Sequence, residues 1–249
     1  MITQIKVELQ ETMGDDAAIA NAAWTSTYDK AKREDKYDDP EKVADLVRRV
    51  VRDGHSVPLE SVVLRFWIRL PVFADRQHMT HRIASHNGLS GRYRTVPSDY
   101  YTVPEDVKDI LIKAAALDHP GLVGPIKDYN EIAQTCFNRY SLWLEGLRGA
   151  EKAGFITNPE YKRARELLRG ILGTSFMVER TTIMNLLSFA NYQRLRNSNH
   201  AQPEIRRIAS LMLARVIEAK VAPIAIGALM DQGWVVAQPN HEFTAAEEE

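Results

Sequence analysis

A run of β-branched and aromatic residues at positions 61–70 limits the folds open to this chain more than any other segment. Its apolar members are Val62, Val63, Leu64, Phe66, Trp67 and Ile68. Such residues favour strands, and the two arginines of the run, Arg65 and Arg69, fall on one face. We therefore predict a strand here, followed by a helix that Pro71 opens and that runs through Ile83.

The rest of the chain is mainly helical. Alternation of Ile5, Val7 and Leu9 predicts a first strand, and residues 174–181 predict another. Two glycines and an asparagine predict a polar loop over 85–91. Apolar residues three or four positions apart, often after a proline, predict helices over 16–24, 39–54, 104–117, 125–154, 159–170, 183–196 and 203–220.

These elements predict an α+β fold with a small, mostly antiparallel sheet packed by several long helices. We expect a single domain over residues 1–249, in which residues 236–249 form a flexible acidic tail.

Charge and cysteine content exclude several functional classes. Lys and Arg total 32 against 33 Asp and Glu, so no global positive field is available for nucleic acid or an anionic membrane surface. No apolar stretch approaches the length of a membrane span, and no secretion signal is apparent. The single cysteine, Cys136, cannot form an internal disulfide and is expected to be a buried packing thiol. We therefore expect a cytoplasmic protein.

Polar residues gather where the predicted helix after Pro71 meets the predicted loop. They are Arg76, Gln77, His78, His81, Arg82, Ser85, Asn87, Ser90, Arg92 and Arg94. Arginine forks, serine hydroxyls and backbone N–H groups near glycine suit a phosphate dianion. Composition alone favours the alternative of a solvated basic turn. His78 and His81 lack a third partner at metal-ligand spacing, so no metal site is expected.

The order of these residues decides between a phosphate site and a basic turn. Residues 80–93 read Thr-His-Arg-Ile-Ala-Ser-His-Asn-Gly-Leu-Ser-Gly-Arg-Tyr. This resembles the signature of the flavin-dependent thymidylate synthases (ThyX), Arg-His-Arg-x-x-Ser-x-Asn-x-x-Ser-x-Arg-Tyr, at seven of its eight fixed positions. Arg76 and Gln77 stand upstream, where the family carries the same pair. The resemblance implies a ThyX-like fold and a homotetramer whose sites are shared between subunits.

Other segments carry the same resemblance over most of the chain. They are Met13-Gly14-Asp15-Asp16, Gly54-His55-x-x-Pro58-x-Glu60 and Arg196-Asn-Ser-Asn-His200-Ala201-Gln202. Asn185, Asn191 and Arg196 also keep the family's spacing.

Carried over position by position, the resemblance implies three groups of site residues. The flavin-binding residues would be Val57, Thr80, His81, Arg82, Asn185, Leu187 and Asn191. The nucleotide-binding residues would be Arg76, Gln77, Gly88, Leu89, Ser90, Gly91, Arg92, Arg169 and Arg196. Arg196 and His55 would be catalytic: Arg196 would face the uracil ring and favour negative charge at N3, and His55 would lie beside the flavin. Its local context alone would have His55 bond the last carbonyls of the preceding helix.

The resemblance also implies the chemistry. The expected reaction is FAD-dependent reductive C5-methylation of a uridine monophosphate, either dUMP or UMP or both. Methylenetetrahydrofolate would be the one-carbon donor and NADPH the reductant. Lone Cys136 agrees, because the other class of thymidylate synthase needs an activated cysteine nucleophile.

Three positions depart from the family pattern and keep alternatives open. Thr80 replaces the first arginine of the signature, Gly88 stands where glutamate is usual, and Leu187 stands where arginine is common. A roomier, less charged pocket favours the alternative of an enzyme specialised for UMP in nucleoside natural-product biosynthesis. Hydroxymethyl transfer is another alternative. Outside the enzyme class, the alternative is a catalytically impaired flavin- or nucleotide-binding protein.

Overall fold

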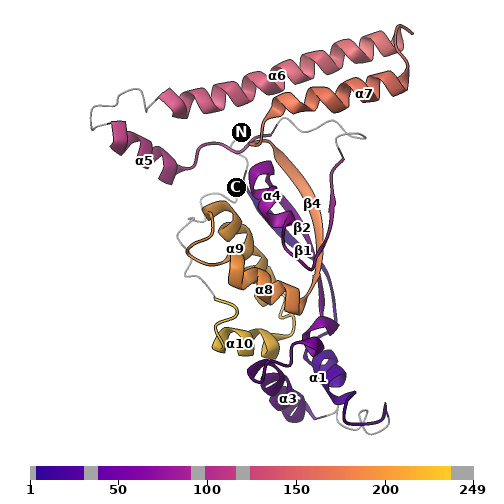
Figure 1. The fold of residues 1–249 in the computed structure, drawn as a ribbon, viewed down its shortest axis with the longest axis vertical. Helices are drawn as coiled ribbons and strands as arrows, with labels where there is room; N and C mark the ends of the chain where they lie inside the picture. The colour runs from indigo at the N-terminus through magenta and orange to yellow at the C-terminus, as the bar shows by residue number, and fades with distance from the viewer. Residues whose placement is uncertain (1–3, 31–38, 91–98, 116–123, 237–249) are drawn as a thin grey trace. The chain divides into compact units, whose positions relative to one another are not determined.

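The computed structural model describes residues 4–30, 39–90, 99–115 and 124–236 (Figure 1). The chain divides into two compact units. Unit 1 comprises Met1–Gln4, Arg69–Arg76 and Gly88–Glu179, and unit 2 comprises Ile5–Ile68, Gln77–Asn87 and Arg180–Glu249. A single domain over 1–249 stays a prediction, and the expected acidic tail lies outside the described residues from position 237 onward.

Four strands form one small antiparallel sheet in the order β1-β2-β4-β3. They are β1 (Lys6–Met13), β2 (Val63–Pro71), β3 (Ser85–Gly88) and β4 (Met177–Asn185). In β2, Leu64, Phe66 and Ile68 are fully buried and alternate with half-buried residues, as the sequence pattern predicts. Each such side chain stabilises the fold by roughly 1.5–3 kcal/mol relative to exposure. The predicted α+β class with a small antiparallel sheet is confirmed.

Unit 2 surrounds its strands with short helices. They are α1 (Asp16–Trp24), α3 (Pro40–Arg52), the 3-10 helix η1 (Val57–Ser61), α8 (Leu186–Arg196), α9 (Pro203–Glu218) and α10 (Pro223–Asp231). Helix α9 packs against β1 and α8, while α1 and α10 pack against α3. Asp39 caps α3 by accepting the N–H of Lys42, and Pro40 occupies the first turn, so local sequence is enough to start this helix.

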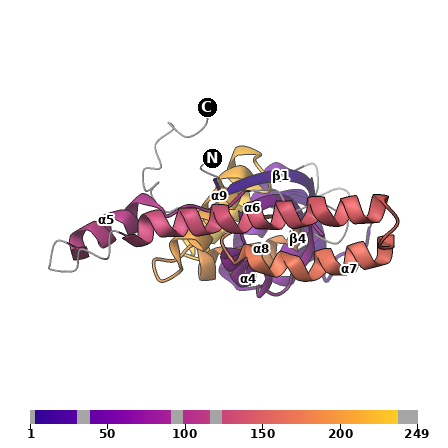
Figure 2. The same cartoon turned by 90° about the horizontal axis from the view of Figure 1, so that it is seen from above.

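Unit 1 is built on one long helix and a shorter helix beside it. Its helices are α5 (Glu105–Ala115), α6 (Gly124–Lys152), α7 (Asn158–Leu168) and the 3-10 helix η3 (Arg169–Leu172). Helices α6 and α7 run side by side (Figures 1 and 2), and a capping box of Thr157 and Glu160 starts α7. Phe137 and Tyr140 of α6 and Leu172 of η3 belong to one buried cluster. Helix α4 (Val72–Met79) runs from unit 1 into unit 2.

Several predicted boundaries are wrong. The helix expected through Ile83 ends at Met79. The backbone N–H groups of Thr80 and His81 bond carbonyls only three residues back, and the Thr80 hydroxyl also donates to the carbonyl of Gln77. Residues 85–88 of the expected loop form strand β3, which pairs with the edge of β4. The strand was predicted to end at position 181, with a helix from position 183. Strand β4 instead continues to Asn185. Buried Thr182 and Met184 keep the strand alternation going.

Two further observations differ from the sequence predictions. Helix α10 and η1 were not predicted. Cys136 is half-buried rather than buried, because it lies at the border of the α6 face that carries Phe137 and Tyr140 into the core.

Candidate active site

Arg196 is the central cation of the candidate site in unit 2. It ends α8, and its Nη2 donates hydrogen bonds to the backbone oxygen of Gln77 (3.4 Å) and to Thr80 Oγ1 (3.2 Å). The Gln77 carbonyl belongs to the last turn of α4, and the C-terminal end of a helix carries a partial negative charge that attracts a guanidinium. Arg196 Nε is buried, and no described residue accepts its hydrogen. An acceptor on a bound ligand would remove that deficit.

The side-chain amide of Gln77 is held by Gln202. Its Nε2 donates to Gln202 Oε1, and Gln202 Nε2 donates to Glu204 Oε2 at 2.9 Å. This chain fixes which end of the Gln77 amide is the nitrogen, because a carboxylate oxygen only accepts. The Oε1 atom of Gln77 is therefore the end that can accept a hydrogen from a ligand.

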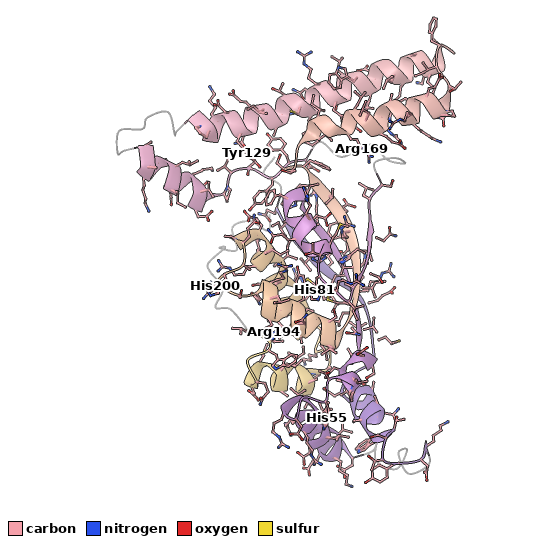
Figure 3. All side chains as sticks on the ribbon, viewed as in Figure 1. His55, His81, Tyr129, Arg169, Arg194 and His200 are labelled. Carbon is pink, nitrogen blue, oxygen red and sulfur yellow. The ribbon has the colours of Figure 1, made fainter. Side chains whose placement is uncertain are left out.

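His81 is buried against α8 (Figure 3). Its Nε2 lies 2.9 Å from the backbone oxygen of Ser188 and 3.1 Å from Ser188 Oγ. Ser188 Oγ gives its own hydrogen to the backbone oxygen of Ile83, so Nε2 of His81 is the donor and Nδ1 is the acceptor of the ring. Burial lowers the pKa of His81, so the ring is neutral near pH 7 and can accept a hydrogen bond through Nδ1.

A polar network centred on buried His78 lies next to these residues in the sequence and on α8. His78 is fully buried, with Nδ1 2.9 Å from Tyr192 Oη and Nε2 2.8 Å from Thr182 Oγ1. Thr182 Oγ1 also lies 3.1 Å from His86 Nδ1, so one hydroxyl links the two histidines. Burial lowers the pKa of His78 to about 3, and the charges of His86 and Arg180 act in the same direction. The network therefore joins α4, β3, β4 and α8 through hydrogen bonds between side chains.

The predicted flavin-binding residues of the late helix lie along α8. Asn185 caps the helix: its Oδ1 accepts the N–H of Ser188 (2.8 Å), and its Nδ2 donates to Glu60 Oε2 (3.3 Å). Glu60 belongs to η1, the element that carries the exposed Val57. The structure thus brings the Val57 segment to the start of α8.

The other flavin candidates of α8 face away from Arg196. Leu187 and Asn191 are half-buried and one turn apart. At about 100° per residue, Leu187 and Arg196 project from opposite sides of the helix. Asn191 accepts a hydrogen bond from exposed Arg194 (3.1 Å), which also lies over the Trp234 ring.

His55 lies apart from this cluster. His55 is exposed just past α3, where its backbone N–H closes the helix on the oxygen of Val50. Figure 3 shows His55 and His81 in different regions of unit 2, so the chain does not bring its two predicted functional histidines together. Arg82 is exposed in the bend after His81.

Predicted nucleotide-binding residues also occur in unit 1. They are Arg76, Gly88, Leu89, Ser90 and Arg169, whereas Gly91 and Arg92 lie outside the described residues. Leu89 extends the sheet edge through a bond from its N–H to the oxygen of Glu179 (3.0 Å). Arg169 is half-buried at the start of η3 (Figure 3), close enough to Tyr140 to act on its phenol electrostatically.

Sequence reasoning missed the residues that hold the site together. They are Thr182, Ser188, Tyr192 and Glu204. Only Ser188 had a local signal, since it follows Asn185 at helix-capping spacing. Within the described ranges, no group of three or more His, Cys, Asp or Glu side chains is placed to hold a metal ion. None of the described helices combines the length and hydropathy that a membrane crossing requires.

Comparisons with known proteins identify the family of the chain. Residues 8–224 match the family model described as thymidylate synthase complementing protein. The flavin-dependent thymidylate synthase of Kosmotoga olearia is 32% identical over 231 residues, which cover 90% of each chain. That of Thermotoga neapolitana is 31% identical over 216 residues, which cover 86% of each chain.

A solved structure shares the fold. The UMP/dUMP methylase PolB from Streptomyces cacaoi, bound with 5-Br dUMP, aligns with a TM-score of 0.69 and 24% identity, over 94% of this chain and 98% of that one. The family match and the identity to its members are decisive. The chain belongs to the flavin-dependent thymidylate synthase family.

Proposed function

We propose that this protein catalyses the FAD-dependent reductive C5-methylation of a uridine monophosphate, dUMP or UMP, with methylenetetrahydrofolate as one-carbon donor and NADPH as reductant. One observation carries the proposal. In a chain of this family, the signature segment folds against Arg196 and leaves its buried Nε donor without an acceptor among the described residues.

Arg196 has the charge and the anchoring that the uracil ring requires. Methyl transfer to C5 needs electron density at that carbon, and a guanidinium beside N3 and its neighbouring oxygen favours negative charge there. Two contacts from the end of α4 hold Nη2 in place, so little reorganisation is needed when the ring polarises.

We place the flavin along the side of α8 that carries Leu187 and Asn191. We assign Asn185, Leu187 and Asn191 to this task, with Val57 at the start of the helix and with His81 and Arg82 by family position. Neutral His81, with Nδ1 as acceptor, matches a ligand that presents N–H groups. When bound, the reduced flavin supplies the electrons that convert the transferred one-carbon unit to a methyl group. We also propose that His55 lies beside the flavin.

The nucleotide phosphate is assigned to arginines and other residues in and just before the signature, together with Arg169 of η3. They are Arg76, Gln77, Gly88, Leu89, Ser90, Gly91, Arg92 and Arg169. Guanidinium forks suit phosphate because they offer two parallel donors. Gly88 lacks the carboxylate side chain that is usual at this position and so leaves room for a ribose 2′-hydroxyl, and we propose that UMP is accepted beside dUMP.

We further propose a homotetramer with sites shared between subunits. The two faces of α8 support this, since Leu187 and Arg196 project to opposite sides of one helix. Helices α5 and α6 also expose large apolar residues that a partner chain would cover, among them Ile110, Ile132 and Trp143. Light scattering of the purified protein measures this directly. We place the enzyme in the cytoplasm, which its single cysteine suits.

The test is anaerobic turnover of FAD-loaded protein with NADPH, methylenetetrahydrofolate and either dUMP or UMP, with the product mass as readout. We expect a methyl-sized gain, and a gain larger by one oxygen would mean hydroxymethyl transfer instead. Arg196→Ala should lower kcat/KM by about 10²–10³-fold, the usual cost of losing one preorganised donor to a developing anion.

Arg48→Ala is the matched control, because it removes an exposed arginine that pairs with Asp45 on the surface of α3. It should leave turnover unchanged. Bound FAD with no product from either nucleotide would refute the methylase and favour a catalytically impaired binding protein.

A further inference from the structure

Thr80 stands where the signature of the family carries an arginine, and its hydroxyl lies between α4 and α8. Thr80 Oγ1 donates to the backbone oxygen of Gln77 at 2.7 Å. A threonine hydroxyl has one hydrogen, and this bond uses it. A lone pair of the same oxygen therefore faces Arg196 Nη2, which donates to it at 3.2 Å.

The contact completes a two-point hold on one end of the guanidinium. Nη2 donates to Thr80 Oγ1 and to the Gln77 oxygen, so both acceptors belong to the turn that ends α4. An arginine side chain has several rotatable bonds, and a single hydrogen bond would leave the guanidinium plane free to swing about Nη2. Two acceptors on different atoms fix that plane. The Nε donor, which has no described acceptor, then points in one direction.

We propose that Thr80 is a positioning residue that orients Arg196 toward the nucleotide, rather than a contact to the flavin. The inference rests on the proposed function, since it assumes that Arg196 meets the uracil ring. Thr80 acts only through Arg196. Its substitution therefore alters nucleotide recognition and turnover and leaves flavin affinity in place.

The test compares Thr80→Val, which keeps the side-chain shape and removes the hydroxyl, with Thr80→Ser, which keeps the hydroxyl. We expect Thr80→Val to weaken dUMP or UMP binding to the FAD-loaded protein by about tenfold, as for one hydrogen bond to a charged group. Thr80→Ser should restore most of that loss. FAD affinity, measured by fluorescence titration, should match the wild type in both variants.

Thr25→Val is the matched control. Thr25 also follows a helix, and its Oγ1 donates to the backbone oxygen of Asn21 at 2.9 Å, so the variant makes the same chemical change at the end of α1. It should leave nucleotide binding unchanged. A similar loss in Thr25→Val would show that the effect of Thr80→Val is one of general stability and would overturn the proposal.

A double-mutant cycle separates positioning from an independent role. Calorimetry with the nucleotide is repeated for Arg196→Ala and for Arg196→Ala with Thr80→Val. If Thr80 acts through Arg196, the second substitution adds no loss once Arg196 is absent. An equal loss in both backgrounds, an unchanged affinity in Thr80→Val, or a loss confined to FAD binding would each overturn the proposal. Failure of the wild type to bind any uridine nucleotide would instead overturn the proposed function.

Discussion

Acidification should destabilise this protein through His78 in particular. The ring is fully buried between Tyr192 and Thr182, and burial lowers its pKa from 6.5 to about 3. A histidine with a folded pKa below its unfolded pKa binds fewer protons in the folded state. Stability is therefore highest above the unfolded value and is lost as the pH falls from about 6.5 to about 3.

Over most of this pH range, the loss in the free energy of unfolding depends only on the protonation of the unfolded state. At pH 5 an unfolded histidine is protonated in an excess of about 30 to 1, whereas the folded ring stays neutral. Proton uptake then favours unfolding by RT ln 33, or about 2 kcal/mol relative to pH 8. The result does not depend on the folded pKa as long as it lies below about 4. His81 changes in the same direction, because burial lowers its pKa also.

Urea unfolding at pH 8, 7, 6 and 5, with wild type and His78→Gln at one protein concentration, tests this reasoning. Glutamine keeps amide donors and acceptors and does not titrate. Trp24, Trp67 and Trp234 lie in unit 2 with His78, so tryptophan fluorescence mainly reports the unfolding of unit 2. The free energy of unfolding should fall about 2 kcal/mol further between pH 8 and pH 5 in the wild type. Equal falls in the two proteins would refute a neutral, buried His78.

Two substitutions in unit 2 should lower stability without touching the candidate site. Gly14→Ala should lower the free energy of unfolding by about 2 kcal/mol or more, because φ is +80° and the new Cβ would lie 2.5 Å from the oxygen of Ser61. Gly54→Ala, at φ +71° with open space around the Cβ, is its control in urea unfolding. Asp16→Ala should cost roughly 2 kcal/mol in the same assay, because the buried carboxylate accepts two backbone N–H groups in the first turn of α10, and an unchanged midpoint would contradict this.

Elements with a local signal were predictable. Helix α3 has its cap at Asp39 and its proline at the first turn, and β2 has its alternation, so both were placed within a residue or two. Strand β3 has neither signal. Its residues, Ser85–Gly88, are polar and mostly exposed, and they form a strand because they pair with β4 far along the chain. Helix α10 is apolar on most sides, which hides helical periodicity.

The candidate site was predictable in its members and not in its contacts. The signature named His81 and Thr80, and the late segment named Arg196, because family resemblance attaches roles to positions. It could not indicate that Thr80 bonds Arg196, a contact across 116 positions. Nor could it indicate that buried His78 bonds Tyr192, since a lone histidine in a helix has no pattern that predicts its partner.

The inner side of α8 explains why these contacts occur together. Ser188, Tyr192 and Arg196 are spaced four residues apart, so they form one stripe on the helix. Each bonds a residue of the short segment 77–81: Ser188 bonds His81, Tyr192 bonds His78, and Arg196 bonds Thr80 and Gln77.

Apolar side chains at these positions would bury more hydrophobic area, but they would tolerate rotation and sliding of the helix. Directional hydrogen bonds do not, because a shift of one residue would leave buried donors and acceptors unpaired at about 1–3 kcal/mol each. The polar stripe thus fixes the register of α8 against the signature segment. Register determines where the Arg196 guanidinium and the outward-facing Asn191 stand, so the same contacts that hold the helix also place both sides of the proposed site.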